Sequence, residues 1–287
     1  MPRKARFLDL PFYDRYRALE MSASRSRPKI VQSPFPAPAA VSGTASASAV
    51  EARPPVSEDV SLLHSYYGAL FLAHGPQHWW PGRSRFEIIV GAILTQNTSW
   101  KNVERAISNL RLAKLLSARA IKEVRASTLA ALLRPSGYFR QKTKTLKAFV
   151  AFLYSEHSGS LDRLFATPTD ALRAQLLEVR GIGPETADSI LLYAGRHPVF
   201  VVDAYSRRIL ERHGLAHPRS SYEKLRSIFE SSLPRDHQLF NEFHALIVHT
   251  GKQFCRKSSP ACSHCALQRF LPGQAFGQSP LAADSTR

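Results

Sequence analysis

The chain has 287 residues, with 39 Lys and Arg against 22 Asp and Glu, and a formal net charge of +17. Its length suits one large domain or two small ones, and its 44% apolar content suits a soluble globular core. So large an excess of positive charge favours a polyanionic partner. No apolar run approaches the roughly 18 residues that a membrane-spanning helix needs, so we expect no membrane partner. The first residues also lack a clean signal-peptide core, which favours a cytoplasmic protein.

The first 57 residues differ in composition from the rest of the chain. They are rich in Ala, Ser, Pro and Arg, and the stretch Ser33–Val50 has neither charge nor periodicity. This composition predicts a disordered basic tail over residues 1–57. An over-extended gene start is the alternative, because Met21 could be the true initiator. A second tail is expected over 272–287, which leaves 58–271 as the folded domain.

From Val60 onward, apolar residues recur with helical spacing. We expect helices over 86–94, 101–116, 121–133, 141–154, 169–179, 184–194, 204–213, 221–231 and 238–251. Thr167 is expected as an N-cap, with Pro168 at the first helical position. The clearest β-prone run, Val199–Val202, is short. The pattern therefore predicts an all-α fold of about ten helices.

A Gly181-Ile182-Gly183 turn joins two of these expected helices. Glycines have no Cβ, so the N–H groups at the helix start can approach a phosphate closely, while Ile182 would anchor the turn in the core. An ordinary helix–helix turn is the alternative. Downstream, Asp203 follows an apolar run and precedes a helix start, where we expect it to be half-buried. It could cap that helix, act on a ligand held nearby, or do both.

All three tryptophans of the chain lie within 22 residues. Trp79, Trp80 and Pro81 are consecutive, and this triplet does not fit one face of a helix. Trp100 follows a polar stretch. Aromatic side chains in a loop more often bind ligands, whereas packing in the core is the alternative for each of them.

Five segments together resemble a known family. Gly-Ile-Gly-Pro-Glu-Thr-Ala-Asp at 181–188 and Val-Asp at 202–203 are similar to the helix-hairpin-helix base-excision glycosylases of the endonuclease III superfamily. Trp-Trp-Pro at 79–81, Leu-Thr-Gln-Asn-Thr at 94–98 and Arg-Pro-Ser-Gly-Tyr-Phe-Arg-Gln-Lys at 134–142 resemble its 3-methyladenine DNA glycosylase III branch in particular. The resemblance implies a two-lobed, all-α helix-hairpin-helix fold with a DNA cleft between the lobes.

In that family, Asp203 would be the catalytic aspartate, and Glu185 stands where many members have a catalytic lysine. A lysine amine attacks the sugar C1′ and forms a Schiff base, which leads to strand cleavage, whereas a carboxylate cannot form one. The resemblance therefore implies a monofunctional DNA N-glycosylase. Water would attack C1′, and Asp203 would support the developing oxocarbenium charge and orient the water, as carboxylates do in glycosidases.

The resemblance also implies a base pocket formed by Trp79, Trp80, Pro81 and Trp100. Enzymes that act on a base flip it out of the duplex and hold it between aromatic faces. A purine alkylated at N3 or N7 is cationic, and tryptophan is the best aromatic partner for a cation. Such a base is already a good leaving group and needs no general acid. We therefore expect excision of alkylated purines from duplex DNA.

Further residues are candidates for contact with DNA. Two of them occupy the places of residues that enter the duplex in endonuclease III, and the others are the hairpin and a basic helix face that would meet phosphates. They are Gln96, Tyr138, Gly181, Ile182, Gly183, Arg140, Lys142 and Lys144. The alternatives are ordinary loop residues and a solvated basic face.

The three cysteines, Cys255, Cys262 and Cys265, match the first three ligands of the family's [4Fe-4S] cluster, but the fourth position is Leu271. Such clusters are usually held by four Cys thiolates. Three alternatives stay open: a cluster with a non-Cys ligand or an open iron corner, a lost cluster, or zinc bound with His264. We favour a labile or incomplete cluster that holds the C-terminal loop on DNA, and expect no organic cofactor.

Three rival functions remain at this stage. One is an endonuclease III-like glycosylase and AP lyase that acts on other lesions, which Glu185 disfavours. Another is the adenine-mismatch branch, which also lacks the lysine but carries an additional C-terminal domain. The third is a non-catalytic DNA-binding relative, which the presence of Asp203 and the tryptophans disfavours. In each case the expected partner is double-stranded DNA, and we expect a monomer in the cytoplasm, at the nucleoid.

Overall fold

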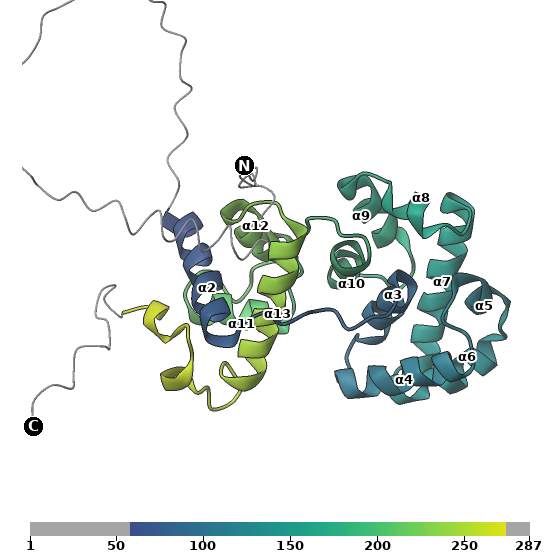
Figure 1. Ribbon diagram of the computed structural model, residues 1–287, viewed down its shortest axis with the longest axis horizontal. Coiled ribbons are helices and arrows are strands. Elements are labelled where there is room, and N and C mark those ends of the chain that lie inside the picture. The colour runs from purple at the N-terminus through teal and green to yellow at the C-terminus, as the bar shows by residue number, and fades with distance from the viewer. Residues whose placement is uncertain (1–57, 274–287) are drawn as a thin grey trace, which may run out of the picture. The chain divides into compact units, whose positions relative to one another are not determined.

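The computed structural model describes residues 58–273, and within that range the chain forms helices and loops (Figure 1). The all-α prediction is confirmed, with twelve α-helices in these residues in place of about ten. They are α2 (Glu58–His74), α3 (Arg85–Leu94), α4 (Trp100–Leu112), α5 (Ala118–Glu123), α6 (Ala126–Leu133), α7 (Phe139–His157), α8 (Leu161–Phe165), α9 (Thr169–Glu178), α10 (Pro184–Ser189), α11 (Ala204–Arg212), α12 (Tyr222–Ser232) and α13 (His237–Gln253). None of these helices is long and apolar enough to cross a membrane. The predicted tails lie outside the described residues, except for Pro272 and Gly273.

Several helix boundaries differ from the sequence-based expectation. The helix expected over 121–133 is divided into α5 and α6, because Val124 and Arg125 adopt extended backbone angles. The expected N-cap at Thr167 is wrong: Pro168 is the N-cap of α9, and the Thr167 hydroxyl donates back to the carbonyl of Arg163 at 3.5 Å. The element expected over 184–194 begins as α10 and continues as one π-helical turn, η3 (Ile190–Ala194).

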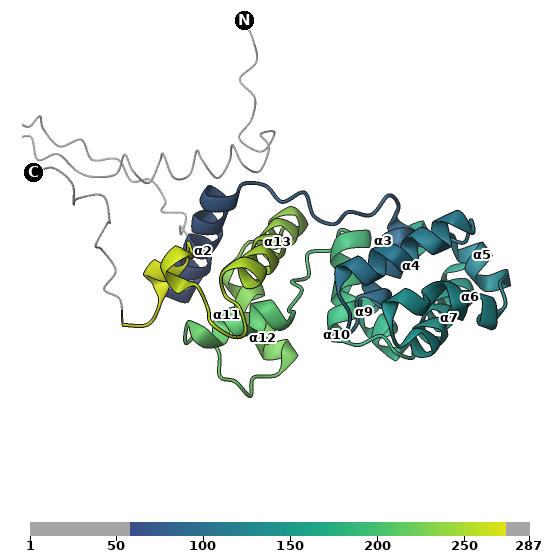
Figure 2. The same cartoon turned by 90° about the horizontal axis from the view of Figure 1, so that it is seen from below.

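The helices form two groups, and the chain passes between them twice (Figures 1 and 2). Helices α3 to α10 pack around one hydrophobic core, which includes Ile89, Leu146 and Leu191. Helix α2, from the start of the described range, packs with α11, α12 and α13 around buried aromatic side chains. The two groups form the lobes of the fold. The connecting segments are residues 75–84 and 195–203, so both the Trp-Trp pair and Asp203 lie where the chain crosses.

The second crossing contains the β-prone run Val199–Val202, which is buried and extended but forms no strand. Two of its backbone N–H groups donate to side chains of α12 instead of to a neighbouring strand. The Phe200 N–H donates to Glu230 Oε1 at 2.9 Å, and the Val202 N–H donates to Tyr222 Oη at 3.3 Å. Because these donors are satisfied, the segment can stay buried and lead directly to Asp203.

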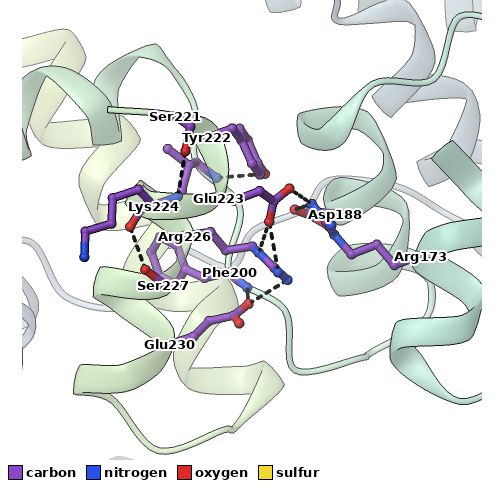
Figure 3. Close-up of polar contacts among 11 residues, drawn as sticks. Arg173, Asp188, Phe200, Ser221, Tyr222, Glu223, Lys224, Arg226, Ser227 and Glu230 are labelled. Carbon is purple, nitrogen blue, oxygen red and sulfur yellow. Dashed lines mark hydrogen bonds and ion pairs between the residues drawn. The ribbon is translucent and has the colours of Figure 1, made fainter. Parts of the chain in front are cut away.

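A chain of ion pairs links the helices on either side of the Gly181–Gly183 turn to α12 (Figure 3). Arg173 of α9 holds Asp188 of α10 through Nε–Oδ1, at 2.6 Å, and its Nη2 reaches Glu223 Oε1 at 2.7 Å. Glu223 pairs in turn with Arg226, and Arg226 with Glu230. Glu230 is also the acceptor of the hydrogen bond from the Phe200 N–H. The ion pairs therefore connect the Gly181–Gly183 turn to the segment that precedes Asp203.

Substitution of Arg173 tests how strongly this link stabilises the fold. Asp188 is fully buried, and burial raises the pKa of its carboxyl while the charge of Arg173 opposes that rise. Arg173→Met would leave this buried carboxylate without its cation, so we expect the free energy of unfolding to fall by about 3 kcal/mol. Chemical denaturation at pH 7 measures the change.

The matched control is Arg119→Met, which breaks an exposed pair with Glu123 four residues along the same helix. Exposed pairs of this kind contribute little, so this variant should unfold like the wild type. Equal behaviour of the two variants would show that the Arg173 pair does not stabilise the fold.

Candidate active site

Asp203 is the N-cap of α11, so its expected capping role is confirmed. One carboxylate oxygen, Oδ1, accepts hydrogen bonds from the N–H of Tyr205 at 2.9 Å, the N–H of Ser206 at 2.8 Å and the Ser206 hydroxyl at 3.0 Å. The second oxygen, Oδ2, accepts none of these three bonds. The side chain is 14% exposed. The carboxylate is therefore fixed through one oxygen, and the other takes no part in the cap.

Asp203 lines a pocket of about 650 Å³ between the two lobes. The pocket brings together most of the side chains that the sequence singled out. Trp79, Trp80, Gln96, Trp100, Glu185 and Asp203 all line it. The expected place of Pro81 in the pocket is wrong, because this residue is exposed and does not line it.

The indole rings of Trp79 and Trp100 pack against Trp80, which in turn packs against the buried ring of Tyr193. The ring centroid of Trp80 lies 4.8 Å from that of Tyr193, 5.1 Å from that of Trp100 and 5.5 Å from that of Trp79. Gly91 makes room for this arrangement, because a Cβ there would come within 3.2 Å of the Trp80 ring. The result is one aromatic wall, formed by the first crossing segment, the start of α4 and η3.

Sequence reasoning did not single out several further residues of the pocket lining, among them Tyr193, His244 and Lys252. Lys252 Nζ lies 5.8 Å from the centre of the Trp79 ring, within cation–π range. His244 Nδ1 lies 2.6 Å from Tyr193 Oη. These residues lie on η3 and α13. In the sequence each is a single polar group within a helical segment, a feature that most helices share, so the sequence did not identify them as pocket residues.

Glu185 projects from the first turn of α10 into the same pocket. Although the residue retains exposed surface, its carboxyl faces into this recess, and the pKa of Glu185 is raised to about 7 by burial and, secondarily, by the charge of Asp203. Near neutral pH the pocket therefore contains one carboxylate, Asp203, beside a second group that is partly protonated.

This raised pKa predicts a pH-dependent difference in stability. The folded protein binds the Glu185 proton more tightly than the unfolded chain does, so the group contributes stability below pH 4.5 that is lost as pH rises through about 7. Because the carboxyl is partly exposed, we expect only about 1 kcal/mol. Measured by denaturation from pH 4 to pH 8, the wild type should lose that amount relative to Glu185→Gln. A constant difference across this range would contradict the raised pKa.

The Gly181–Gly183 turn has the geometry expected of a close backbone approach. Gly181 has φ +87°, and a Cβ there would collide with the Thr145 side chain of α7. A Cβ on Gly183 would meet nothing within 4 Å, so the space above the start of α10 is open. Ile182 is buried in the core, which confirms its expected anchoring. Gln96 Nε2 donates to the Gly181 carbonyl at 3.1 Å, which ties its loop to the turn.

Tyr138, Arg140 and Lys144 lie together at the start of α7, around a surface recess of about 320 Å³. Tyr138 is 73% exposed and has φ +44°, in the left-handed region that a tyrosine rarely adopts. The helix therefore begins with an aromatic side chain directed outward and two basic side chains close behind it.

The expected phosphate contact at Lys142 is wrong. Its side chain is 2% exposed, and Nζ donates to the carbonyls of Leu94 at 2.8 Å and Ser136 at 2.7 Å. Burial lowers the pKa of this amine to about 8. Lys142 instead connects the end of α3 to the turn before α7, so it positions the loops that carry Gln96 and Tyr138.

The cysteine loop does not supply a complete cluster site. Cys255, Cys262 and Cys265 are free thiols that line a small cavity of about 20 Å³, with Leu271 at its edge. Arg212 Nη1 donates to Cys255 Sγ at 3.3 Å. Within residues 58–273, no three His, Cys, Asp or Glu side chains are placed to hold a metal ion. These residues do not fit a cluster held by four thiolates, nor zinc held with His264. The preference for an incomplete cluster stays a prediction.

Two arginines of α11 hold this loop through backbone carbonyls. Arg208 donates to Cys255 at 2.7 Å and to Gly251 at 2.9 Å, and Arg212 donates to Arg256 at 2.7 Å and to Lys257 at 3.0 Å. The loop is therefore fastened by protein groups.

These bonds predict that the fold does not need a metal. The anaerobically purified protein should contain fewer than four iron and fewer than four sulfide ions per chain. Treatment of this protein with a chelator should leave its melting temperature unchanged. A full iron complement whose removal lowers the melting temperature would contradict this expectation and would show that a cluster supports the loop.

The comparisons with known proteins agree with this geometry. The family model described as the HhH-GPD superfamily base excision DNA repair protein matches residues 90–235. A Methanocaldococcus jannaschii protein, named as a candidate DNA repair glycosylase, is 44% identical over 73% of this chain and 95% of its own length. Endonuclease III of Sulfolobus acidocaldarius is 28% identical over 66% of this chain and 82% of its own. The chain belongs to the HhH-GPD superfamily, and the predicted enzyme class, DNA N-glycosylase, is confirmed.

Solved structures support the same fold. The crystal structure of H. pylori 3-methyladenine DNA glycosylase bound to 1,N6-ethenoadenine has a TM-score of 0.59 and 31% identity, and the match covers 68% of this chain and 97% of that one. A trapped endonuclease III–DNA covalent intermediate has a TM-score of 0.64 at 19% identity, over 74% of this chain and 94% of that one. The second likeness concerns the fold alone. Together they confirm the predicted glycosylase fold class.

Proposed function

We propose that this protein removes alkylated purines from duplex DNA by hydrolysis of the N-glycosidic bond, without cleavage of the strand. One observation carries the proposal: a single pocket combines the Asp203 carboxylate with three indole rings, and has Glu185 at the place of the family's lysine. The carboxylate suits the sugar, the indoles suit a flipped base, and no amine stands at the position from which a lysine would capture the sugar.

In the proposed reaction the damaged base enters beside the tryptophans and its sugar lies against Asp203. As the bond from C1′ to the base nitrogen breaks, positive charge develops on the sugar, and Asp203 Oδ2 stabilises it. Such charge stabilisation is strongest when the group is already held in place, as the three hydrogen bonds to Oδ1 hold this one. The cationic base leaves as a neutral molecule with the electron pair of that bond, and water then adds to C1′ and gives up a proton to the solvent.

The absence of lyase activity is proposed from Glu185. A carboxyl group cannot form the Schiff base that leads to strand cleavage, whatever its protonation. Its raised pKa also limits the negative charge beside Asp203 near neutral pH. Hydrolysis and release of an intact abasic strand follow from this arrangement.

The preference for alkylated purines is proposed from the aromatic wall and from the relative of known substrate. Indole faces attract a cationic base, and the H. pylori protein, 31% identical, is named for 3-methyladenine. Lys252 already places an ammonium near Trp79. We expect a charged base to displace this ammonium, whereas a neutral base can stack beside it.

Duplex DNA is the proposed partner, with the domain of residues 58–271 acting as a monomer along the cleft between the lobes. The open space above Gly183 would receive a phosphate at the start of α10. The exposed ring of Tyr138 and the side chain of Gln96 would enter the gap left by the flipped base, and Arg140 and Lys144 would meet the backbone.

Duplexes that carry 3-methyladenine, 7-methylguanine, thymine glycol or adenine opposite oxidised guanine test this function. Strand breaks should appear with the alkylated purines and only after alkaline treatment. Asp203→Asn should slow base release about 100- to 1000-fold with little change in affinity for the duplex, because it removes charge and keeps an N-cap. The matched control is Asp236→Asn, at the N-cap of α13, which should keep full activity.

Breaks without alkali in the wild type would contradict the monofunctional assignment. Equal loss of affinity and rate in Asp203→Asn would mean that Asp203 is a structural cap only. Glu185→Lys tests for a gain of function. If position 185 corresponds to that of the family's catalytic lysine, the new amine should produce strand breaks without alkali at the same lesions.

A further inference from the structure

A polar chain behind Asp203 ends on the oxygen that the α11 backbone does not hold. His244 of α13 is 5% exposed, and its Nε2 lies 3.7 Å from Asp203 Oδ2. Its other ring nitrogen, Nδ1, lies 2.6 Å from the hydroxyl of Tyr193, which is itself buried. All three side chains line the pocket.

The Nε2 atom of His244 is buried, and within the described residues it has no hydrogen-bond partner. A buried polar nitrogen without a partner is unfavourable, so such atoms call for an explanation. The group that it faces is Oδ2, and the separation of 3.7 Å is only slightly longer than a hydrogen bond. A small movement of the carboxylate would close it.

The surroundings select one form of the imidazole. Burial lowers the pKa of His244, and the charge of Asp203 offsets this only in part, so the ring is neutral and carries one proton. Burial raises the pKa of Tyr193 far above its usual range, so its hydroxyl keeps a proton that it can donate to Nδ1 across 2.6 Å. In that tautomer the ring proton is on Nε2 and faces the carboxylate, which is the electrostatically favourable choice.

We propose that His244 is a positioning residue for Asp203: its Nε2–H, oriented by the Tyr193 hydroxyl, forms a hydrogen bond with Oδ2 when a nucleotide enters the pocket. Oδ1 and Oδ2 are then both held, and a remaining lone pair of Oδ2 is directed at the sugar. This inference rests on the proposed role of Asp203 in base release. It resembles the serine-protease arrangement with the roles exchanged, since here a histidine orients a carboxylate.

Single-turnover kinetics with a 7-methylguanine duplex test the proposal. His244→Leu should slow base release about 10- to 100-fold, because a donor to a charged acceptor is lost, while affinity for the duplex stays unchanged. His244→Gln can still donate to Oδ2 and should recover most of the rate. The matched control, His237→Gln on the first turn of the same helix, should keep the full rate.

A spectroscopic readout separates orientation from simple packing. Nitrogen NMR of the histidine rings should show His244 protonated at Nε2, identified by loss of its signals in His244→Gln. Tyr193→Phe should produce a mixture of tautomers and an intermediate rate. A folded His244→Leu protein with the wild-type rate, or a ring protonated at Nδ1, would overturn the proposal. Neither result would affect the role of Asp203, which is tested separately by the rate and the duplex affinity of Asp203→Asn.

Discussion

The N-terminus of α11 is the constraint on which the site depends. Its first N–H groups need an acceptor, and Asp203 Oδ1 supplies one for Tyr205 and Ser206 at once. The cap therefore does more than start a helix: it fixes a carboxylate at the edge of a pocket and leaves one oxygen uncommitted. A carboxylate held in this way needs no reorganisation when positive charge appears beside it, which is the condition for effective electrostatic catalysis.

The path of the chain brings the remaining groups to that oxygen. Residues 75–84 and 195–203 are the two crossings between the lobes, and they carry the Trp-Trp pair and Asp203. The second crossing is held by α12, through backbone bonds to Tyr222 and Glu230. Glu230 also belongs to the chain of ion pairs that begins on α9 and α10. The Gly181–Gly183 turn and the Asp203 carboxylate are therefore connected through side chains of α12. The turn that we propose receives a phosphate and the carboxylate that we propose acts on a sugar thus share one framework.

Sequence reasoning could predict what depends on local chemistry. The helical spacing, the glycine turn and the Asp203 cap are short-range features, and the structure bears them out. Sequence reasoning could not predict which polar side chains are buried. Lys142 resembled a surface cation, but its amine joins two carbonyls from segments far apart in the chain. His244 and Tyr193 meet only because α13 folds back against η3. The raised pKa of Glu185 likewise depends on burial in the assembled pocket and, secondarily, on the charge of Asp203, 18 residues away.

The central claim is that Asp203 faces developing positive charge on the sugar. Its most direct test compares the affinities of one duplex with a cationic pyrrolidine abasic analogue and one with a neutral tetrahydrofuran analogue. The wild type should prefer the cation by at least about 100-fold, as transition-state analogues are preferred, and Asp203→Asn should lose that preference while it binds the neutral duplex normally. An equal preference in both proteins would contradict the account.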